Sequence, residues 1–103
     1  MYTVVSTKNF QRHLKTLRTR LRLSDDEIAE FQENLWSVLE HYQETGDIIG
    51  GYDDHFLVNK PWIGYREFHV LDDVLVVYAD ISTQNVIRLM GVYNHDMLHQ
   101  GKL

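Results

Sequence analysis

The sequence predicts a single α+β domain over residues 1–103: an N-terminal strand, then a helical hairpin packed on one face of a small, curved, mainly antiparallel sheet. Three observations predict this class. Apolar residues recur at helical spacing in the first half, polar and apolar residues alternate in the second half, and the connections there are short. A length of 103 residues fits one domain.

The first half of the chain predicts a strand and two helices. Residues 2–7 are rich in β-branched side chains, which is typical of a strand. Ser24 and Glu27 form a capping-box pattern that begins the second helix, and Gly46 is expected to end it. The first helix is predicted by apolar residues at spacings of 4, 3 and 4, namely Phe10, Leu14, Leu17 and Leu21.

The second half predicts the main part of the sheet. Residues 62–71, 74–80 and 85–93 read as three strands, and their short connections make them antiparallel hairpins. Residues 50–61 are expected to form a loop, and residues 94–103 a tail with about one helical turn. The second face of the sheet is expected to stay open.

Alternation along the middle strand places His69 on the face opposite the apolar Phe68. Asp73 lies just past the next turn, His95 follows the last strand, and His55 lies in the preceding loop. Imidazoles and a carboxylate suit acid–base cleavage of RNA, where a base takes the 2′-OH proton and an acid protonates the leaving 5′-oxygen. Composition alone leaves a structural role for these histidines open. His13 and His41 are expected on helix surfaces, and no metal site is expected.

Charge is distributed unevenly along the chain. The formal net charge is −5, yet residues 1–24 hold six Lys or Arg and no acidic residue. This basic segment could follow RNA phosphates or dock an acidic partner, and a solvated helix face is the alternative. The candidate RNA-binding residues of this segment are Arg12, Lys15, Arg18 and Arg22.

The composition also excludes several classes. With zero cysteines, the chain has no disulfide, no cysteine-based zinc site and no cysteine nucleophile. Its apolar stretches are too short for a membrane span, and no secretory leader is apparent. A cytoplasmic location is therefore expected.

Three segments within residues 52–98 carry a resemblance: YDDHFL, WIGYREFHVLDDVLVVY and VIRLMGVYNHDML. Together they resemble the YafQ-type branch of the RelE toxins, in the RelE/ParE superfamily. The resemblance implies a small bacterial endoribonuclease of a type II toxin–antitoxin system, which cuts messenger RNA on the ribosome without a metal or cofactor. It also implies a silencing antitoxin of the DinJ/RelB kind, through which alone the toxin would reach operator DNA.

The same resemblance assigns the site. The family's catalytic set falls on His55, His69, Asp73 and His95. We assign His95 as general acid, with Asp73 and His69 sharing the base and orienting work, and His55 supporting the phosphate or positioning the base. Gly91 stands where the family usually has an arginine that neutralises the phosphate, and the candidates to replace that arginine are Lys60, Arg66 and Arg88.

Two other functions stay open at this point. The chain could be a catalytically weakened module of the same fold that mainly binds its antitoxin. It could also resemble the ParE toxins and inhibit a topoisomerase, in which case the histidine set would have no role.

Overall fold

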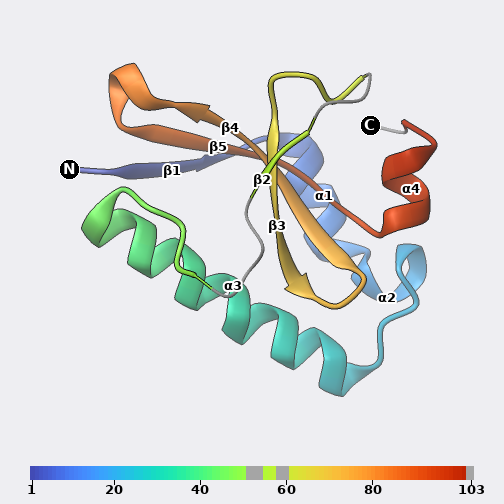
Figure 1. Ribbon diagram of the computed structural model, residues 1–103. Helices are drawn as coiled ribbons and strands as arrows, with labels where there is room; N and C mark the ends of the chain where they lie inside the picture. Colours follow the sequence, from blue (N-terminus) through green and yellow to red (C-terminus); the bar gives the residue numbers. More distant parts are fainter. Residues whose placement is uncertain (51–54, 58–60, 102–103) are drawn as a thin grey trace.

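A computed structural model of the chain describes residues 1–50, 55–57 and 61–101 (Figure 1). The described residues form one sheet in the order β1-β5-β4-β3-β2, in which β1 runs parallel to β5 and the other pairs are antiparallel. The strands are β1 (Thr3–Ser6), β2 (His55–Phe56), β3 (Arg66–Leu71), β4 (Val74–Ile81) and β5 (Val86–Tyr93). The helices are α1 (Lys8–Lys15), α2 (Leu17–Arg20), α3 (Asp25–Thr45) and α4 (His95–His99), and a 3-10 turn spans Ser82–Gln84. The predicted α+β class is confirmed.

The long helix α3 has the predicted ends. The Ser24 hydroxyl accepts the Glu27 backbone N–H, and the Glu27 carboxylate accepts the Ser24 N–H, which completes the capping box. Gly46 ends the helix at φ 80°, and a Cβ there would lie 2.5 Å from the Tyr2 ring. Both the left-handed backbone and the close approach therefore require glycine.

The expectation of one continuous first helix is wrong, because the chain leaves helical geometry at Thr16 (φ −120°, ψ 21°). The Thr16 hydroxyl donates to the Arg12 carbonyl, a local bond that competes with the helix ladder. Leu14 is 38% exposed, and His13 is buried in its place with 6% exposure. The expected surface position of His13 is therefore also wrong, whereas His41 is half-buried on α3.

The main core lies between the helices and one face of the sheet. Helix α1 packs against β5 and α3 packs against β3, and Figure 1 shows α3 running along the sheet. One apolar cluster joins buried residues of helices α1 to α3 and of the strands. Its members include Phe10 and Leu17 from α1 and α2, Phe31 and Val38 from α3, and Phe68, Val76 and Leu89 from the strands. This arrangement confirms that the helices cover one face.

The second face is less open than expected. A smaller cluster of Trp62, Val77 and Tyr93 lies there, with Met97 and Leu98 of α4 packed against it. The Trp62 indole donates to the Leu98 carbonyl at 2.7 Å, so α4 is fastened to this face. Helix α4 therefore covers part of the face that was expected to stay open.

The largest differences from the predicted strands are a later start of β3 and an additional short strand, whereas β1, β4 and β5 differ from the prediction by at most one residue at each end. Strand β3 begins at Arg66 because the Tyr65 N–H closes a turn onto the Trp62 carbonyl, and Gly64 takes a φ of 93°. Strand β2 lies within the predicted loop, where His55 pairs with Glu67 and Phe56 with Arg66. Two residues are too short a run to give a strand signal in the sequence.

Candidate functional site

Three polar residues reach one end of the sheet from three different elements. His69 lies in β3, where it aligns with Leu75 of β4 and, through it, with Tyr93 of β5. Asp73 lies in the two-residue turn between β3 and β4. His95 is the first residue of α4, immediately after Asn94, whose side chain accepts the Met97 N–H and caps the helix. The antiparallel register thus gathers residues that are up to 26 positions apart.

The three side chains form a continuous chain of contacts. One Asp73 carboxylate oxygen accepts the His95 backbone N–H at 3.0 Å and lies 2.5 Å from His95 Nδ1. On its other side, His95 Nε2 lies 3.2 Å from His69 Nε2. The side chains of His95 and Asp73 are 46% and 66% exposed, so a large substrate can reach them. The structure therefore brings together three of the four predicted catalytic residues.

The contacts define the proton positions that this group can use. The hydrogen bond from the His95 backbone, with a smaller contribution from its ring, lowers the pKa of Asp73 below its ordinary value. The ionised carboxylate therefore favours a proton on His95 Nδ1, which leaves Nε2 to exchange a proton. Because the two Nε2 atoms face each other, one of the two rings can donate a hydrogen bond to the other.

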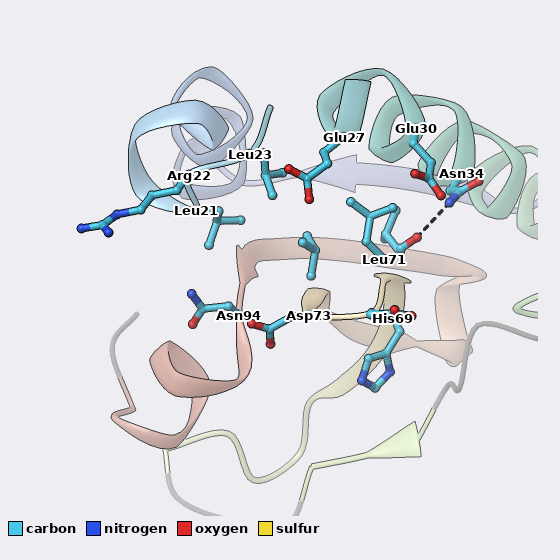
Figure 2. Close-up of a pocket in the computed structure, with 13 residues that line it drawn as sticks. Leu21, Arg22, Leu23, Glu27, Glu30, Asn34, His69, Leu71, Asp73 and Asn94 are labelled. Carbon is cyan, nitrogen blue, oxygen red and sulfur yellow. Dashed lines mark hydrogen bonds between the residues drawn. The ribbon is translucent and has the colours of Figure 1, made fainter. Parts of the chain in front are cut away.

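His69 and Asp73 line a groove of about 980 Å³, together with Asn94, which directly precedes His95. In Figure 2, His69, Asp73 and Asn94 lie along its lower side, while Glu27 and Glu30 approach from α3 on its upper side. Asn34 of α3 donates to the Val70 carbonyl at 2.9 Å and so fixes α3 against β3. The α3 wall of the groove is acidic, and this favours approach of a polyanion from the side of the histidines.

The fourth predicted catalytic residue is only partly described. The backbone of His55 lies in β2 and pairs with Glu67 of β3, which is two residues before His69. The side chain of His55 lies outside the described part of the structure. Lys60, one of the cationic candidates, also lies outside the described residues. Their predicted roles stay predictions.

Arg88 reaches the histidine face because of an irregularity in β5. Val77 aligns with Gly91 but Tyr78 aligns with Leu89, so Met90 forms a bulge. The extra residue reverses the alternation and puts Arg88 on the face of Gly91 and His69. Arg88 aligns with Ala79, four residues along β4 from the partner of His69, so it lies roughly 13 Å from His69 along the strand direction and two strands across the sheet.

Arg66 lies on the other face of the sheet. Its guanidinium donates from Nε to the Tyr78 hydroxyl at 3.0 Å and lies 4.2 Å from the centre of the Phe56 ring. The structure therefore does not bring Arg66 to the histidine pair, and its predicted contact with RNA stays a prediction. The side chain instead closes the outer end of the helix-covered core.

The predicted basic residues of the first helices are exposed, with Arg22 alone lining the groove. Figure 2 shows the Arg22 guanidinium directed outward from the groove, away from Asp73. Arg18 forms an ion pair with Asp25, and Arg12 donates to Asn9 at 3.0 Å. Contact of Arg12, Lys15, Arg18 and Arg22 with RNA stays a prediction.

The structure offers little for a metal ion within the residues it describes. His95 and His99 stand four residues apart, a spacing that can bring two ligands to one side of a helix. No group of three or more metal-ligating side chains occurs in the described ranges.

Sequence reasoning missed two side chains behind the site. The buried His13 accepts the Val92 backbone N–H at Nδ1 over 2.9 Å, and Arg20 donates to the Val92 carbonyl at 3.2 Å. Burial, and then the nearby charges of Arg20 and Arg12, lower the pKa of His13 to about 4. The one available signal was the position of His13, three residues after Phe10 on the buried side of the helix.

Comparisons with known proteins agree with this architecture. A toxin from Helicobacter pylori, solved as a copper-bound mutant, is 26% identical and superposes with a TM-score of 0.70 over 95% of this chain and 99% of its own. YafQ from Escherichia coli is 20% identical (TM-score 0.68; 95% and 98% covered), and YafQ in the E. coli DinJ-YafQ complex is 22% identical (TM-score 0.67; 95% and 98% covered). No curated protein matches the chain by sequence.

Among the described residues, none of the helices has the length and apolar character needed to cross a membrane.

The family model gives the assignment. The model that describes the bacterial toxin of type II toxin–antitoxin systems, YafQ, matches residues 2–100. The chain therefore belongs to the YafQ family of type II toxins.

Proposed function

We propose that this chain is an endoribonuclease that cleaves messenger RNA on the ribosome by metal-independent acid–base catalysis. The observation that supports the proposal is the chain of contacts from Asp73 through His95 to His69. Two imidazoles in contact, one of them oriented by a carboxylate, can take up and release a proton at adjacent positions.

The proposed reaction needs two proton transfers at one phosphodiester. A base removes the proton of the ribose 2′-OH, and the 2′-oxygen attacks the phosphorus. The bond to the 5′-oxygen then breaks as an acid protonates that leaving oxygen, which yields a 2′,3′-cyclic phosphate and a free 5′-OH. We assign the acid to His95, with Asp73 and His69 sharing the base and orienting work, and with His55 supporting the phosphate or positioning the base.

Charge on the phosphate must also be offset during the reaction. Among the described residues we assign this neutralisation to a protonated histidine of the pair. Arg88 is too distant, because it aligns four residues along β4 from the partner of His69. We propose that Arg88 and the exposed cations of α1 and α2 hold neighbouring phosphates of the RNA.

The proposal is tested by His95→Ala. Inducing the unmodified chain in a bacterium should arrest growth and produce messenger 5′ ends that are phased to codons. His95→Ala should abolish both effects, since it removes the proposed acid without leaving a buried cavity. The matched control is His99→Ala, which removes an exposed histidine from the same helix and should leave arrest and cleavage intact.

Each result decides between functions. Cleavage that survives His95→Ala contradicts the catalytic assignment. Growth arrest that survives without any cut in RNA favours the topoisomerase reading, in which the histidines have no role. An unmodified chain that neither arrests growth nor cuts RNA favours a binding module.

We also propose an antitoxin as partner. The E. coli relative is solved in the DinJ-YafQ complex, and this supports a DinJ/RelB-like antitoxin for the present chain. The antitoxin would silence the toxin, and operator DNA would be reached only through it. Ribosome and messenger RNA are the further proposed partners, in a cytoplasmic setting.

Gly91 favours one second candidate, a module that has lost catalytic strength and mainly binds its antitoxin. A Cβ at Gly91 would lie 2.5 Å from the Tyr93 hydroxyl, so the space for a side chain is already filled by that ring. The phosphate-neutralising arginine of the family pattern is thus excluded here by packing. The induction experiment above separates this candidate from the nuclease.

A further inference from the structure

Side chains of the first two helices complete the outer edge of β5. Strand β1 covers that edge only as far as Leu89, whose carbonyl accepts the Thr7 N–H at 3.1 Å. Beyond that point no described strand adjoins β5 on this side, and its backbone groups need other partners. The carbonyl of the bulged Met90 accepts from the Asn9 side chain at 3.1 Å and from the Thr7 hydroxyl at 3.3 Å.

Val92 has both backbone groups held in this way. Its N–H donates to His13 Nδ1 at 2.9 Å, and its carbonyl accepts from Arg20 Nη1 at 3.2 Å. In register, Val92 aligns with Val76. It lies three residues before His95, so its position sets where the chain turns into α4.

The same two side chains also contact the segment that carries His95. The His13 ring meets the Tyr93 ring edge-on at 5.2 Å between centres. The Arg20 guanidinium lies 5.9 Å from the Tyr93 ring centre, and its Nη2 lies 3.6 Å from the Met97 sulfur in α4. Arg20 thus spans from β5 to α4 on both sides of His95.

We infer that His13 and Arg20 are positioning residues that hold His95 in contact with Asp73 and His69 by fixing both backbone groups of Val92. The inference rests on the proposed function, because it gives these residues an effect on the chemical step. A hydrogen-bond acceptor is required at His13, since the Val92 N–H is a donor. The lowered pKa of His13 keeps the ring neutral, and therefore an acceptor, at neutral pH.

The test compares two substitutions at His13. His13→Leu removes the acceptor, and it should lower kcat for RNA cleavage by roughly tenfold while KM changes less than about twofold, because a misplaced acid acts on the chemical step. His13→Asn keeps an oxygen acceptor near the position of Nδ1 and should retain kcat within about threefold. Arg20→Met, which keeps the length of the side chain, should resemble His13→Leu.

A loss of folding must be told apart from a loss of positioning. Val38→Ala is the control, because Val38 is fully buried on α3 and holds no part of the β5 edge. It should lower Tm at least as much as His13→Leu yet leave kcat unchanged below Tm. An unchanged kcat in His13→Leu, or an equal loss in Val38→Ala, would overturn the inference.

A second readout does not depend on activity. The ¹⁵N resonances of the His95 ring report its contacts with Asp73 and His69, and they should shift in His13→Leu and Arg20→Met but not in Val38→Ala. If the unmodified chain cleaves no RNA, the proposed function fails. These resonances still show whether His13 and Arg20 hold His95 in place. Unchanged His95 resonances in both edge variants would overturn the inference.

Discussion

His13 and His95 illustrate two ways in which this fold uses an imidazole. His13 is 6% exposed, and its Nδ1 is bonded to a backbone N–H that cannot titrate. His95 is half-exposed, and its ring lies between a carboxylate and a second imidazole. Burial beside a fixed backbone donor lowers the pKa of His13 and keeps its ring neutral at neutral pH, whereas the exposed ring of His95 is open to a substrate. The contrast separates a positioning residue from a proposed catalytic one.

The largest effect, a loss of RNA cleavage, is expected from Asp73→Asn, which changes the partner of His95 and leaves His13 untouched. An amide in place of the carboxylate can donate to His95 Nδ1 and stabilise the wrong tautomer, so cleavage should fall by roughly 10²- to 10⁴-fold. Single-turnover cleavage of a messenger fragment on ribosomes measures it. Tm should change little because the side chain is 66% exposed. A fall of less than about threefold would mean that the carboxylate does not orient His95.

Gly91→Ala tests how tightly the region behind the site is packed. The new methyl group would lie 2.5 Å from the hydroxyl of the buried Tyr93, so the free energy of unfolding should fall by about 2–3 kcal/mol. Gly50→Ala is the matched control, because no atom lies within 4 Å of a Cβ there. Urea denaturation of both variants measures the difference. Equal midpoints would show that the Tyr93 ring moves aside easily, and would reopen this position to an arginine.

Acid should destabilise the fold through His13. Its pKa is lowered from 6.5 to about 4, so between these values the unfolded chain binds a proton that the folded chain does not. The free energy of unfolding therefore falls as pH drops through this window, by up to about 3 kcal/mol over the full shift. Arg12 and Arg20 add to the effect by repelling a charged ring, and Tyr93 contributes an uncharged neighbour.

The comparison that isolates His13 is the pH dependence of His13→Asn. Its side chain does not titrate, so unfolding in urea at pH about 7 and about 5 should show a smaller loss than the unmodified chain shows. The same loss in both proteins would assign the acid sensitivity to other groups.

The smallest effect is expected from Arg88→Ala. Arg88 is exposed on the histidine face, so the substitution should raise KM a few-fold and leave kcat unchanged. Cleavage measured at low and at high salt checks the electrostatic origin, since the difference from the unmodified chain should shrink as salt rises. A difference that is independent of salt would contradict a phosphate contact.

Local signals in the sequence were sufficient for much of the fold. The capping box at Ser24 and the glycine at position 46 specify the ends of α3 through contacts within a few residues. Alternation and short turns also allowed Asp73 and His95 to lie near His69, whereas their grouping into one site came from the family resemblance. The break at Thr16 did not follow from local signals, since its hydroxyl competes with a helix that the apolar spacing otherwise supports.

Features that depend on distant partners could not be predicted. His13 is buried because Val92, 79 residues later, offers an N–H without a strand neighbour. The bulge at Met90 decides the face of Arg88, and the adjacent Gly91 is the one local signal for it, because a glycine inside a strand often marks a bulge. Both features arise where the sheet edge meets α1, so they depend on tertiary structure more than on local pattern.

The pairing of β1 with β5 has a consequence for biosynthesis. Thr3 aligns with Val86, so the first strand made by the ribosome has to wait for the last one before it can pair. Until residues 86–93 are available, the chain has neither this closing pair nor the segment on which His95 sits. A chain cut off before β5 would therefore lack both the partner that β1 needs and the contact of His95 with Asp73.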